Sequence, residues 1–447
     1  MESGYYSLFS NLDSPLSRIT IRGMLKVKPV TILWACMGLA LAGLLIYQLP
    51  PVKQRLGWRV DFAMAYLRGV VRPVGEVPTA LPQPAVRVTS NPGGDTPGGT
   101  ETPGLTEAPG HLPTSTPTPS LPTPSPTPIP ASASLPAPAW ERQDINNCGP
   151  TSLAMYLRFY GWEGDQFDID EVLKPQRDDR NVNVEELVYY VRTRVGWLSV
   201  IYRVGGDLSV LKKLLAAGFP VMIEETFRFA DPYWPNDDLW AAHYNLLTGY
   251  DDARQVFTGQ DSFYGADQKI AYQKLDEYWH SFNHVYILLY PPEQEEKVKS
   301  ILGEDWDERS NRQRALQKAQ DDVDANPSDA FAWFNEGTNL VYFERYDEAA
   351  VAYDRARALG LPQRMLRYQF GPFFAYFYAR RLDDLFALTQ YALKITPNSE
   401  EAKLWHGWGL YRSGDSNGAI ADFQSALEEN ANYQDAQYAL EFVRANP

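Results

Sequence analysis

The sequence predicts three kinds of structure in one chain: a single N-terminal transmembrane helix, an α+β domain and an all-α solenoid of repeated helix pairs. Residues 30–49 form an uncharged apolar run of 20 residues, the length that an α-helix needs to cross a hydrocarbon core. Residues 139–292 alternate between helical and strand patterns. From about residue 293 the sequence becomes charged and helical, with a repeat period near 34 to 36 residues that is typical of stacked helix pairs.

The N-terminal part differs in charge from the rest of the chain. Residues 1–72 hold nine basic and three acidic side chains, a net charge of +6. Because the formal charge of the whole chain is −15, the remainder carries −21. A basic start before an acidic body favours contact with anionic lipid and argues against nucleic acid as a partner.

The apolar run is interpreted as a retained signal anchor. The competing interpretation is a cleaved signal peptide, but the run is long for one, and residues 48–51 offer no small-residue cleavage site. We place the short segment 1–29 in the cytoplasm and the rest of the chain outside it. Residues 50–72 are amphipathic and fit either a helix on the membrane surface or a plain juxtamembrane helix.

Residues 73–138 are rich in proline and threonine. They hold 18 of the 34 prolines of the chain. Because proline lacks an N–H and favours the polyproline II conformation, this composition predicts a disordered stalk. The stalk would hold the domain at 139–292 away from the membrane.

A short run in that domain, NNCGPTSLAM at residues 146–155, predicts a tight turn that begins a helix. Pro150 suits the first turn of a helix, where its missing N–H costs nothing. Cys148 then lies at the helix N-terminus, which favours the thiolate form and hence a nucleophile. The alternative is a small buried hydrophobic residue. The other cysteine, Cys36, lies in the apolar run, so Cys148 has no partner for a structural disulfide.

A thiolate nucleophile needs an imidazole to take and return a proton, and the imidazole needs an orienting group. Residues 243–248 and 255–259 predict two strands of a hairpin, with His243 at the start and Asp261 just past the end. Such a hairpin brings Asp261 back near His243, so that one ring nitrogen faces the carboxylate and the other faces Cys148. The alternatives are a core histidine and a turn-capping aspartate.

Three motifs in order carry a family resemblance: Gln143 with NNCGPTSLAM, AAHYNLLTGYDDA at 241–253 and TGQDSFYG at 258–265. Residues 140–292 thereby resemble the papain-like cysteine peptidases of the bacteriocin-processing type, peptidase family 39. The resemblance implies a papain-like α+β fold and the catalytic residues Cys148, His243 and Asp261. Gln143 would be an oxyanion-hole donor, together with the N–H of Cys148.

Other elements of this domain follow from hydrophobic patterns. A polar loop is expected after the Cys148 helix, to about Asn181. The aromatic and acidic segment 227–240 predicts a solvated loop; the alternatives are the border of a substrate cleft and a cation site, although its spacing matches no calcium-loop pattern. The expected helices are 185–195 and 208–217, and the expected further strands are 198–204, 221–226 and 285–290.

No cofactor is expected. His280 and His284 are four residues apart, the spacing of two imidazoles on one helix face, but the sequence has no HExxH pattern and no evident third zinc ligand. No GxxxxGK[ST] run occurs either, so the chain encodes no nucleotide-binding exporter.

Residues 293–327 predict a connecting helical segment, and residues 328–447 resemble tetratricopeptide repeats. The middle repeat is degenerate, because Leu385 stands where an alanine would let two helices approach closely. Such arrays bind a protein partner in their concave surface, or here only support the peptidase-like domain. The matching residues are Trp333, Gly337, Ala349, Tyr353, Ala356 and Pro362 in the first repeat, Ala392 and Pro397 in the second, and Gly407, Leu410, Gly414, Ala419, Phe423 and Ala426 in the third.

Two functions follow from this organisation. One is a membrane-anchored extracytoplasmic cysteine peptidase that acts on a peptide or protein and binds a partner through its repeats. The other is a non-catalytic peptide-binding scaffold of the cell envelope. The joint presence of Cys148, His243, Asp261 and Gln143 favours the peptidase, since a scaffold has no need of all four.

Overall fold

The computed structural model describes residues 34, 36–39, 41–43, 47, 50–82, 128–176 and 179–446. The chain divides into two compact units, residues 1–64 and 65–447. Helix α2 (Pro50–Val71) runs across this division. Within the described residues, no helix is both long and apolar enough to span a membrane. The predicted span at 30–49 lies largely outside those residues.

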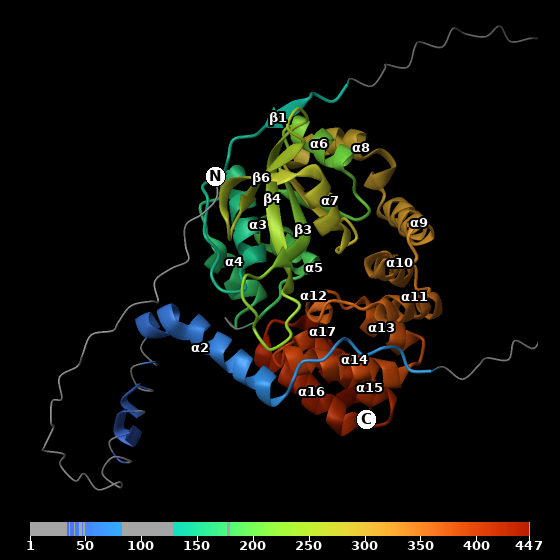
Figure 1. The fold of residues 1–447 in the computed structure, drawn as a ribbon. Coiled ribbons are helices and arrows are strands. Elements are labelled where there is room, and N and C mark those ends of the chain that lie inside the picture. Colours follow the sequence, from blue (N-terminus) through green and yellow to red (C-terminus); the bar gives the residue numbers. More distant parts are fainter. Residues whose placement is uncertain are drawn as a thin grey trace, which may run out of the picture. The chain divides into compact units, whose positions relative to one another are not determined.

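The α+β domain is built on one antiparallel sheet of seven strands in the order β2-β7-β3-β4-β5-β6, with β1 paired to β4 (Figure 1). The central strands β3 and β4 are buried along most of their length. The strands are β1 (Ser132–Ser134), β2 (Ser199–Arg203), β3 (Val221–Arg228), β4 (Trp240–Asp251), β5 (Val256–Asp261), β6 (Gly265–Ala271) and β7 (Tyr286–Tyr290).

Helices cover both faces of this sheet (Figure 1). Alternate residues of a strand point to opposite faces, and neighbouring residues of β3 accordingly enter different cores. Met222 packs with α3 (Cys148–Phe159) and α5 (Val184–Arg194). Val221 and Ile223 pack with α6 (Leu208–Ala216) and α7 (Tyr272–His280) on the other face. The central strands are therefore covered on both faces, and the polar residues within them, such as Glu224 and His243, are buried.

The helices and strands expected at 185–195, 208–217, 198–204, 221–226 and 285–290 all form, with small shifts at their ends. The expected polar loop after the Cys148 helix is wrong, because α4 (Gln166–Leu173) lies there. Its signal was present in the sequence: Asp165 and Asp168 cap each other's backbone N–H groups in a capping box. Strand β6 was also missed, since its alternation of polar residues resembles a loop.

Both described ends of the proline-rich segment 73–138 contact folded elements. Strand β1 pairs with β4 from Ser132 to Ser134. Near the other end, the side chain of Arg357 donates to the carbonyls of Pro78 and Thr79, and the Tyr391 hydroxyl donates to the carbonyl of Gly75. The disordered segment predicted over 73–138 therefore does not extend to these ends, and residues 83–127 lie outside the described residues.

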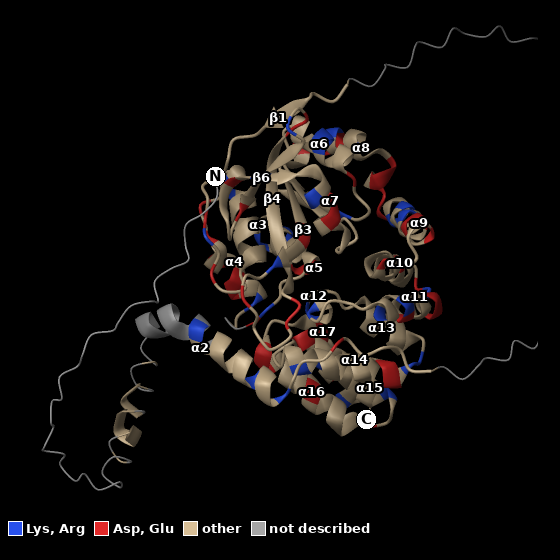
Figure 2. Ribbon diagram, in the orientation of Figure 1, with Lys and Arg blue, Asp and Glu red and all other residues tan. Residues whose placement is uncertain are grey.

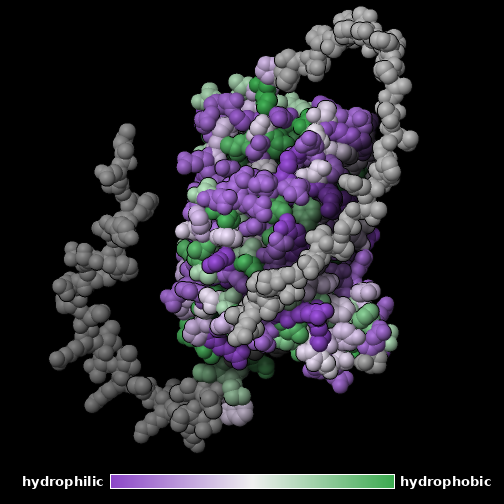
Figure 3. All heavy atoms as spheres, turned by 90° about the vertical axis from the view of Figure 1, so that its right-hand side faces the viewer, coloured by the Kyte–Doolittle hydropathy of each residue, from purple (hydrophilic) through white to green (hydrophobic). Residues whose placement is uncertain are grey.

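The C-terminal part is all helical and is connected to the sheet domain by two 3-10 turns, Pro292–Gln294 and Gly303–Trp306. Its helices carry charges of both signs (Figure 2), and hydrophobic residues lie scattered among hydrophilic ones on the face shown in Figure 3. The helices are α8 (Glu295–Leu302), α9 (Glu308–Ala325), α10 (Ala330–Tyr342), α11 (Tyr346–Leu359), α12 (Met365–Tyr368), α13 (Gly371–Tyr378), α14 (Leu382–Ile395), α15 (Glu400–Arg412), α16 (Ser416–Glu429) and α17 (Gln434–Ala445).

Helix pairs α10/α11, α13/α14 and α15/α16 form at the three predicted repeats. In the first and third pairs a glycine allows close approach, because a Cβ on Gly337 would lie 2.8 Å from the ring of Tyr353, and one on Gly407 would lie 2.6 Å from Phe423. In the middle pair Leu385, which stands where an alanine was expected, is fully buried.

Candidate active site

Cys148 is the first residue of helix α3 and is partly exposed. The turn before it is fixed by helix α4. The buried side chain of Asn147 donates to Oε1 of Gln166 at 2.9 Å and to Oδ2 of Asp170 at 2.8 Å. The hydroxyl of Thr151 donates back to the carbonyl of Asn147 at 2.7 Å. The start of α3, and with it the thiol, is thereby held in one place.

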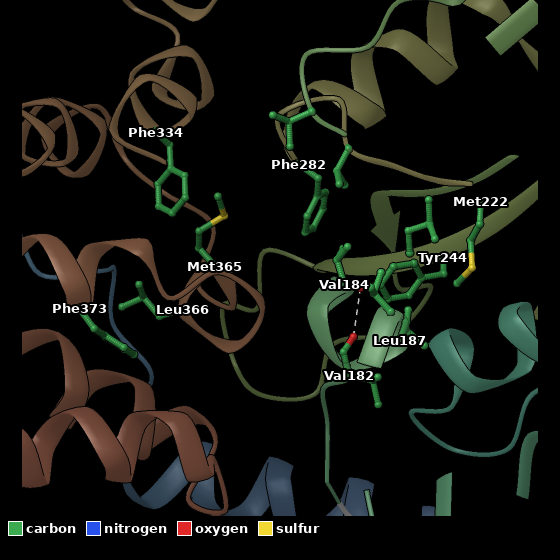
Figure 4. Close-up of a cluster of buried hydrophobic side chains, with 14 of the residues drawn as sticks. Val182, Val184, Leu187, Met222, Tyr244, Phe282, Phe334, Met365, Leu366 and Phe373 are labelled. Carbon is green, nitrogen blue, oxygen red and sulfur yellow. Dashed lines mark hydrogen bonds between the residues drawn. The ribbon is translucent and has the colours of Figure 1, made fainter. Parts of the chain in front are cut away.

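Helix α3 is also bonded to the strand that carries the histidine. The hydroxyl of Ser152 donates to the carbonyl of Tyr244 at 3.0 Å, and the hydroxyl of Tyr244 donates to the carbonyl of Val182 at 3.1 Å. Figure 4 shows Tyr244 among Val184, Leu187 and Met222, with this second bond drawn as a dashed line. Tyr244 follows His243 directly, so the same contacts bring His243 to Cys148.

The Cys148 thiol lies close enough to the imidazole of His243 for each group to shift the pKa of the other. The ring is buried, and its Nε2 lies 3.2 Å from Oδ1 of Asp261. Nε2 has no partner that meets hydrogen-bond geometry, so the contact with Asp261 is an ion-pair contact. Hydrogen bonds of this kind often tighten only when substrate binds. Because Nε2 faces Asp261, we assign Nδ1 as the ring nitrogen that faces the sulfur of Cys148. The structure thus brings Cys148, His243 and Asp261 into contact.

Asp261 ends strand β5 and is held by its own turn. Its Oδ1 accepts from the backbone N–H groups of Phe263 at 2.7 Å and Tyr264 at 2.8 Å. Burial acts to raise the pKa of this carboxyl, but the contact with His243 and these two N–H groups outweigh it, so the pKa lies below its ordinary value. Asp261 therefore stays ionised beside the imidazole.

Electrostatics favour a thiolate–imidazolium pair. Burial acts to raise the pKa of the Cys148 thiol, but the hydrogen bond and charge of His243 outweigh it, and the pKa lies below its ordinary value. Burial acts to lower the pKa of His243, yet Asp261 and Cys148 together raise it to about 10. The two shifts have opposite directions, as expected when each group stabilises the charged form of the other.

Gln143 lies against the residue that follows Asp261. Its backbone N–H donates to the carbonyl of Ser262 at 3.0 Å, and its Oε1 accepts from the hydroxyl of Ser262 at 2.8 Å. The amide nitrogen is then the end of the side chain that can donate elsewhere. The N–H of Cys148 is a second candidate donor, because the first N–H groups of a helix have no partner within it.

Three buried ionisable residues around this site were not expected from the sequence. Lys174 donates to the carbonyl of Asn146 at 3.2 Å, and burial lowers its pKa. Glu224 and Glu225 lie on β3, where Glu225 is the register partner of His243 and accepts from the side-chain amide of Asn245 at 3.0 Å. Burial raises the pKa of both glutamates. A signal existed for them, since two acidic residues interrupt an otherwise apolar strand.

His280 and His284, the two histidines considered as zinc ligands, each lie beside the carboxylate of an aspartate. Nε2 of His280 lies 3.1 Å from Asp329, and Nε2 of His284 lies 3.2 Å from Asp276. Among the residues that the structure describes, no group of three or more His, Cys, Asp or Glu side chains is placed to hold a metal ion.

Comparison with protein families matches residues 134–287 to the Peptidase_C39 like family. Comparison with curated proteins finds no match. Among solved structures, the chain is similar to a Bacillus anthracis protein described as a C39-like peptidase, with 19% identity, a TM-score of 0.29, and coverage of 36% of this chain and 97% of that one.

Two further solved structures have similar sequence identities and TM-scores to this chain. A double glycine motif protease from an AMS/PCAT transporter, in complex with its leader peptide, has 19% identity and a TM-score of 0.26, with 36% of this chain and 94% of that chain covered. YrrB, a TPR protein with an unusual peptide-binding site, has 21% identity and a TM-score of 0.27, with 30% and 69% covered. Likenesses at this level establish neither fold nor function for the chain.

The matched residues 134–287 include Gln143, Cys148, His243 and Asp261. The part of the chain that matches the family is therefore the part in which Cys148, His243 and Asp261 meet. This match of the sheet domain to the Peptidase_C39 like family supports a cysteine peptidase.

Proposed function

We propose that this protein is a membrane-anchored cysteine peptidase that acts outside the cytoplasm on a peptide or protein substrate. The observation that carries the proposal is the contact of His243 with both Cys148 and Asp261. A buried structural histidine needs a partner for its ring nitrogens, but it has no need of a thiol at a helix N-terminus on one side and an ionised carboxylate on the other.

The proposed reaction proceeds through a thioester. The thiolate of Cys148 adds to the carbonyl carbon of the scissile bond, and the side-chain amide of Gln143 and the N–H of Cys148 donate to the oxyanion. The C–N bond breaks as the imidazolium of His243 gives its proton to the leaving amine. His243 then takes a proton from water, whose oxygen attacks the thioester. The C–S bond breaks, which releases the acid and restores the thiolate.

A cavity of about 1110 Å³ supports a role for the repeats in substrate or partner binding. It is lined by residues of the sheet domain and of the repeat helices, including Glu185, Tyr202, Glu224, Phe370, Phe374 and Trp405. The carboxyl of Glu224 is close enough to Cys148 for their charges to interact. The residues that line the cavity do not include Cys148, His243, Asp261 or Gln143, so a polypeptide held there would contact the repeats without covering the thiol itself.

Membrane anchoring rests on the apolar run at 30–49, and the extracytoplasmic location rests on the shortness of the segment 1–29 and on the proline-rich segment that follows the run. The alternative function is a scaffold that binds peptides without cleaving them. The two functions differ in what Cys148 does, because only the peptidase requires an activated thiol.

Profiling of a peptide library with the native chain and with Cys148→Ala tests the proposal. Cleavage products that require Cys148 and disappear in His243→Ala are the expected result. If the two variants and the native chain give the same products, or if iodoacetamide labels Cys148 no faster than a free thiol in both native chain and His243→Ala, the site is not that of a peptidase.

A further inference from the structure

The loop between β3 and β4, residues 229–239, leads into the strand of His243, and the repeat domain holds it. Arg364 lies in the connection between α11 and α12 and is almost fully buried. Its two terminal nitrogens donate to the two carboxylate oxygens of Asp237, at 2.6 and 2.5 Å. This paired geometry is the strongest arrangement of an arginine and a carboxylate. The acidic loop expected to be solvated is thus joined to the repeats.

The same guanidinium reaches the strand itself. It donates to the carbonyl of Trp240 at 3.1 Å, and its centre lies 4.0 Å from the centre of the Trp234 ring. Trp240 is the first residue of β4, three positions before His243. One side chain of the repeat domain therefore fixes both the loop and the start of the catalytic strand.

The neighbouring residue holds the loop a second time. Oε1 of Gln363 accepts from the indole N–H of Trp234 at 2.8 Å, and its Nε2 donates to the carbonyl of Asn236 at 3.1 Å. The backbone N–H of Gln363 donates to Oδ2 of Asp238 at 2.6 Å. Residues 363 and 364 together thus contact three consecutive loop residues, 236–238, as well as the tryptophan before them.

Arg364 is needed for this loop conformation because the Asp237 side chain is fully buried. Burial acts to raise the pKa of Asp237, but the bonds and charge of Arg364 outweigh it, and the pKa stays below its ordinary value. Removing one partner of a buried pair leaves a charge without compensation. The loop would then have to move Asp237 toward water, which also moves the start of β4.

One end of the loop touches the site, and the other end packs in the core. Phe227, just before the loop, has its ring 5.3 Å from the imidazole of His243 and 5.1 Å from the ring of Phe263, which follows Asp261 closely. At the other end, the ring of Trp240 stacks on Phe282 at 5.6 Å. Trp240 and Phe282 belong to a buried cluster that is continuous from the sheet to the repeats, part of which Figure 4 shows.

We propose that Arg364 is a positioning residue of the Cys148–His243 site. It acts through Asp237 and Trp240, so the imidazole keeps its place beside the thiol only while the repeats are docked on the sheet domain. The inference rests on the proposed function, because it gives the repeats a part in holding the peptidase site in addition to any part in binding.

The test is the pH dependence of Cys148 alkylation by iodoacetamide, measured on the full chain with Cys36→Ser as the parent so that one thiol reacts. Arg364→Ala should lower the rate at pH 6 by ~10-fold or more, because the thiol pKa should rise toward the ~8.5 of a free thiol. Arg364→Lys, which keeps the charge but not the paired geometry, should fall between that variant and the parent.

Arg357→Ala is the matched control. Arg357 is as deeply buried as Arg364 and is paired with Asp384 at 3.0 Å, but it contacts residues 78 and 79 instead of the loop. Both alanine variants should lower the melting temperature, whereas only Arg364→Ala should change the pH profile. An unchanged profile in folded Arg364→Ala, or an equal change in Arg357→Ala, overturns the inference.

Two further variants keep the test decisive. If Arg364→Ala does not fold, Gln363→Ala removes three side-chain bonds to the loop. It should lower the rate at pH 6 in the same direction, whereas a profile equal to that of the parent would contradict the inference. His243→Ala distinguishes a failure of the proposed function from a failure of the role proposed for Arg364. If that substitution leaves the profile unchanged, the proposed function fails, and if it changes the profile while Arg364→Ala does not, only the role of Arg364 fails.

Discussion

Ser262 and Gln143 hold each other through two hydrogen bonds. The hydroxyl of Ser262 donates to Oε1 of Gln143 at 2.8 Å, and the backbone N–H of Gln143 donates to the carbonyl of Ser262 at 3.0 Å. Because Ser262 follows Asp261, the segment before helix α3 and the end of strand β5 form one unit. The group expected to donate to the oxyanion and the group that orients the imidazole are therefore positioned together.

Gln143→Ala should lower turnover by ~10²–10³, the usual effect of removing one oxyanion donor. Alkylation of Cys148 should stay nearly normal, because the thiolate does not need that donor. Ser262→Ala frees Oε1 of Gln143 and should give a smaller loss of turnover in the same direction. Single-turnover cleavage of a peptide found by profiling, with alkylation in parallel, provides the measurement. Equal losses in both assays for Gln143→Ala would indicate a structural role instead.

Asp261→Ala should slow both alkylation and turnover, because it removes the carboxylate beside His243 and the acceptor of two backbone N–H groups. Asp261→Asn keeps an oxygen for both roles and should be milder. The same two assays separate these variants. If both substitutions only lower the melting temperature and leave the folded fraction fully active, the three residues are not an active site.

Cys148 should remain reactive at acid pH. Its pKa lies below the ordinary value and that of His243 is raised to about 10, so the thiolate–imidazolium pair persists from the low pKa of the thiol up to about pH 10. The alkylation rate should therefore be nearly constant between pH 6 and 8, whereas in His243→Ala it should rise with an inflection near ~8.5, as for a free thiol. An inflection near that value in the parent would exclude the pair.

Glu401→Gln should change how stability depends on pH. Burial, together with Glu186 and Asp179, raises the pKa of Glu401 to about 8, against an unfolded value near ~4.3. Between these values the folded state binds more protons than the unfolded state, so stability falls as pH rises through this window. The substitution should raise the melting temperature at pH 8 but not at pH 5. The exposed Glu428→Gln is the control, and an equal effect of both substitutions would contradict the assignment.

The membrane topology is tested by adding a broad-specificity protease to intact cells. If residues 30–49 anchor the chain with its body outside, cleavage in the proline-rich segment should release a soluble fragment that contains the sheet domain and the repeats. Western blotting with an antibody to the repeats detects it. If the fragment appears only after lysis, the proposed orientation is wrong.

The candidate active-site residues could be found in the sequence because each lies within a short, recognisable sequence pattern. The turn and helix around Cys148, the hairpin of His243 and Asp261, and the segment of Gln143 all occupy short stretches whose conformation depends mainly on neighbours in the chain. The structure places the first three in contact and Gln143 beside Ser262. The sequence analysis did not find the buried ionisable residues near the site, such as Lys174 and Glu225. They are functional candidates only because they are buried, and their burial depends on which distant segments pack over them.

The sequence by itself determined the order of the parts: an apolar N-terminal run, a proline-rich segment, a domain with a cysteine and a histidine of complementary roles, and helical repeats. Only the tertiary structure decided that the loop at 229–239 is held by Arg364. A loop rich in aspartate and aromatic residues has the composition of a solvated loop, and nothing local marks its partner. An arginine more than a hundred residues away pairs with Asp237 because folding buries both, and a buried charge requires an opposite one.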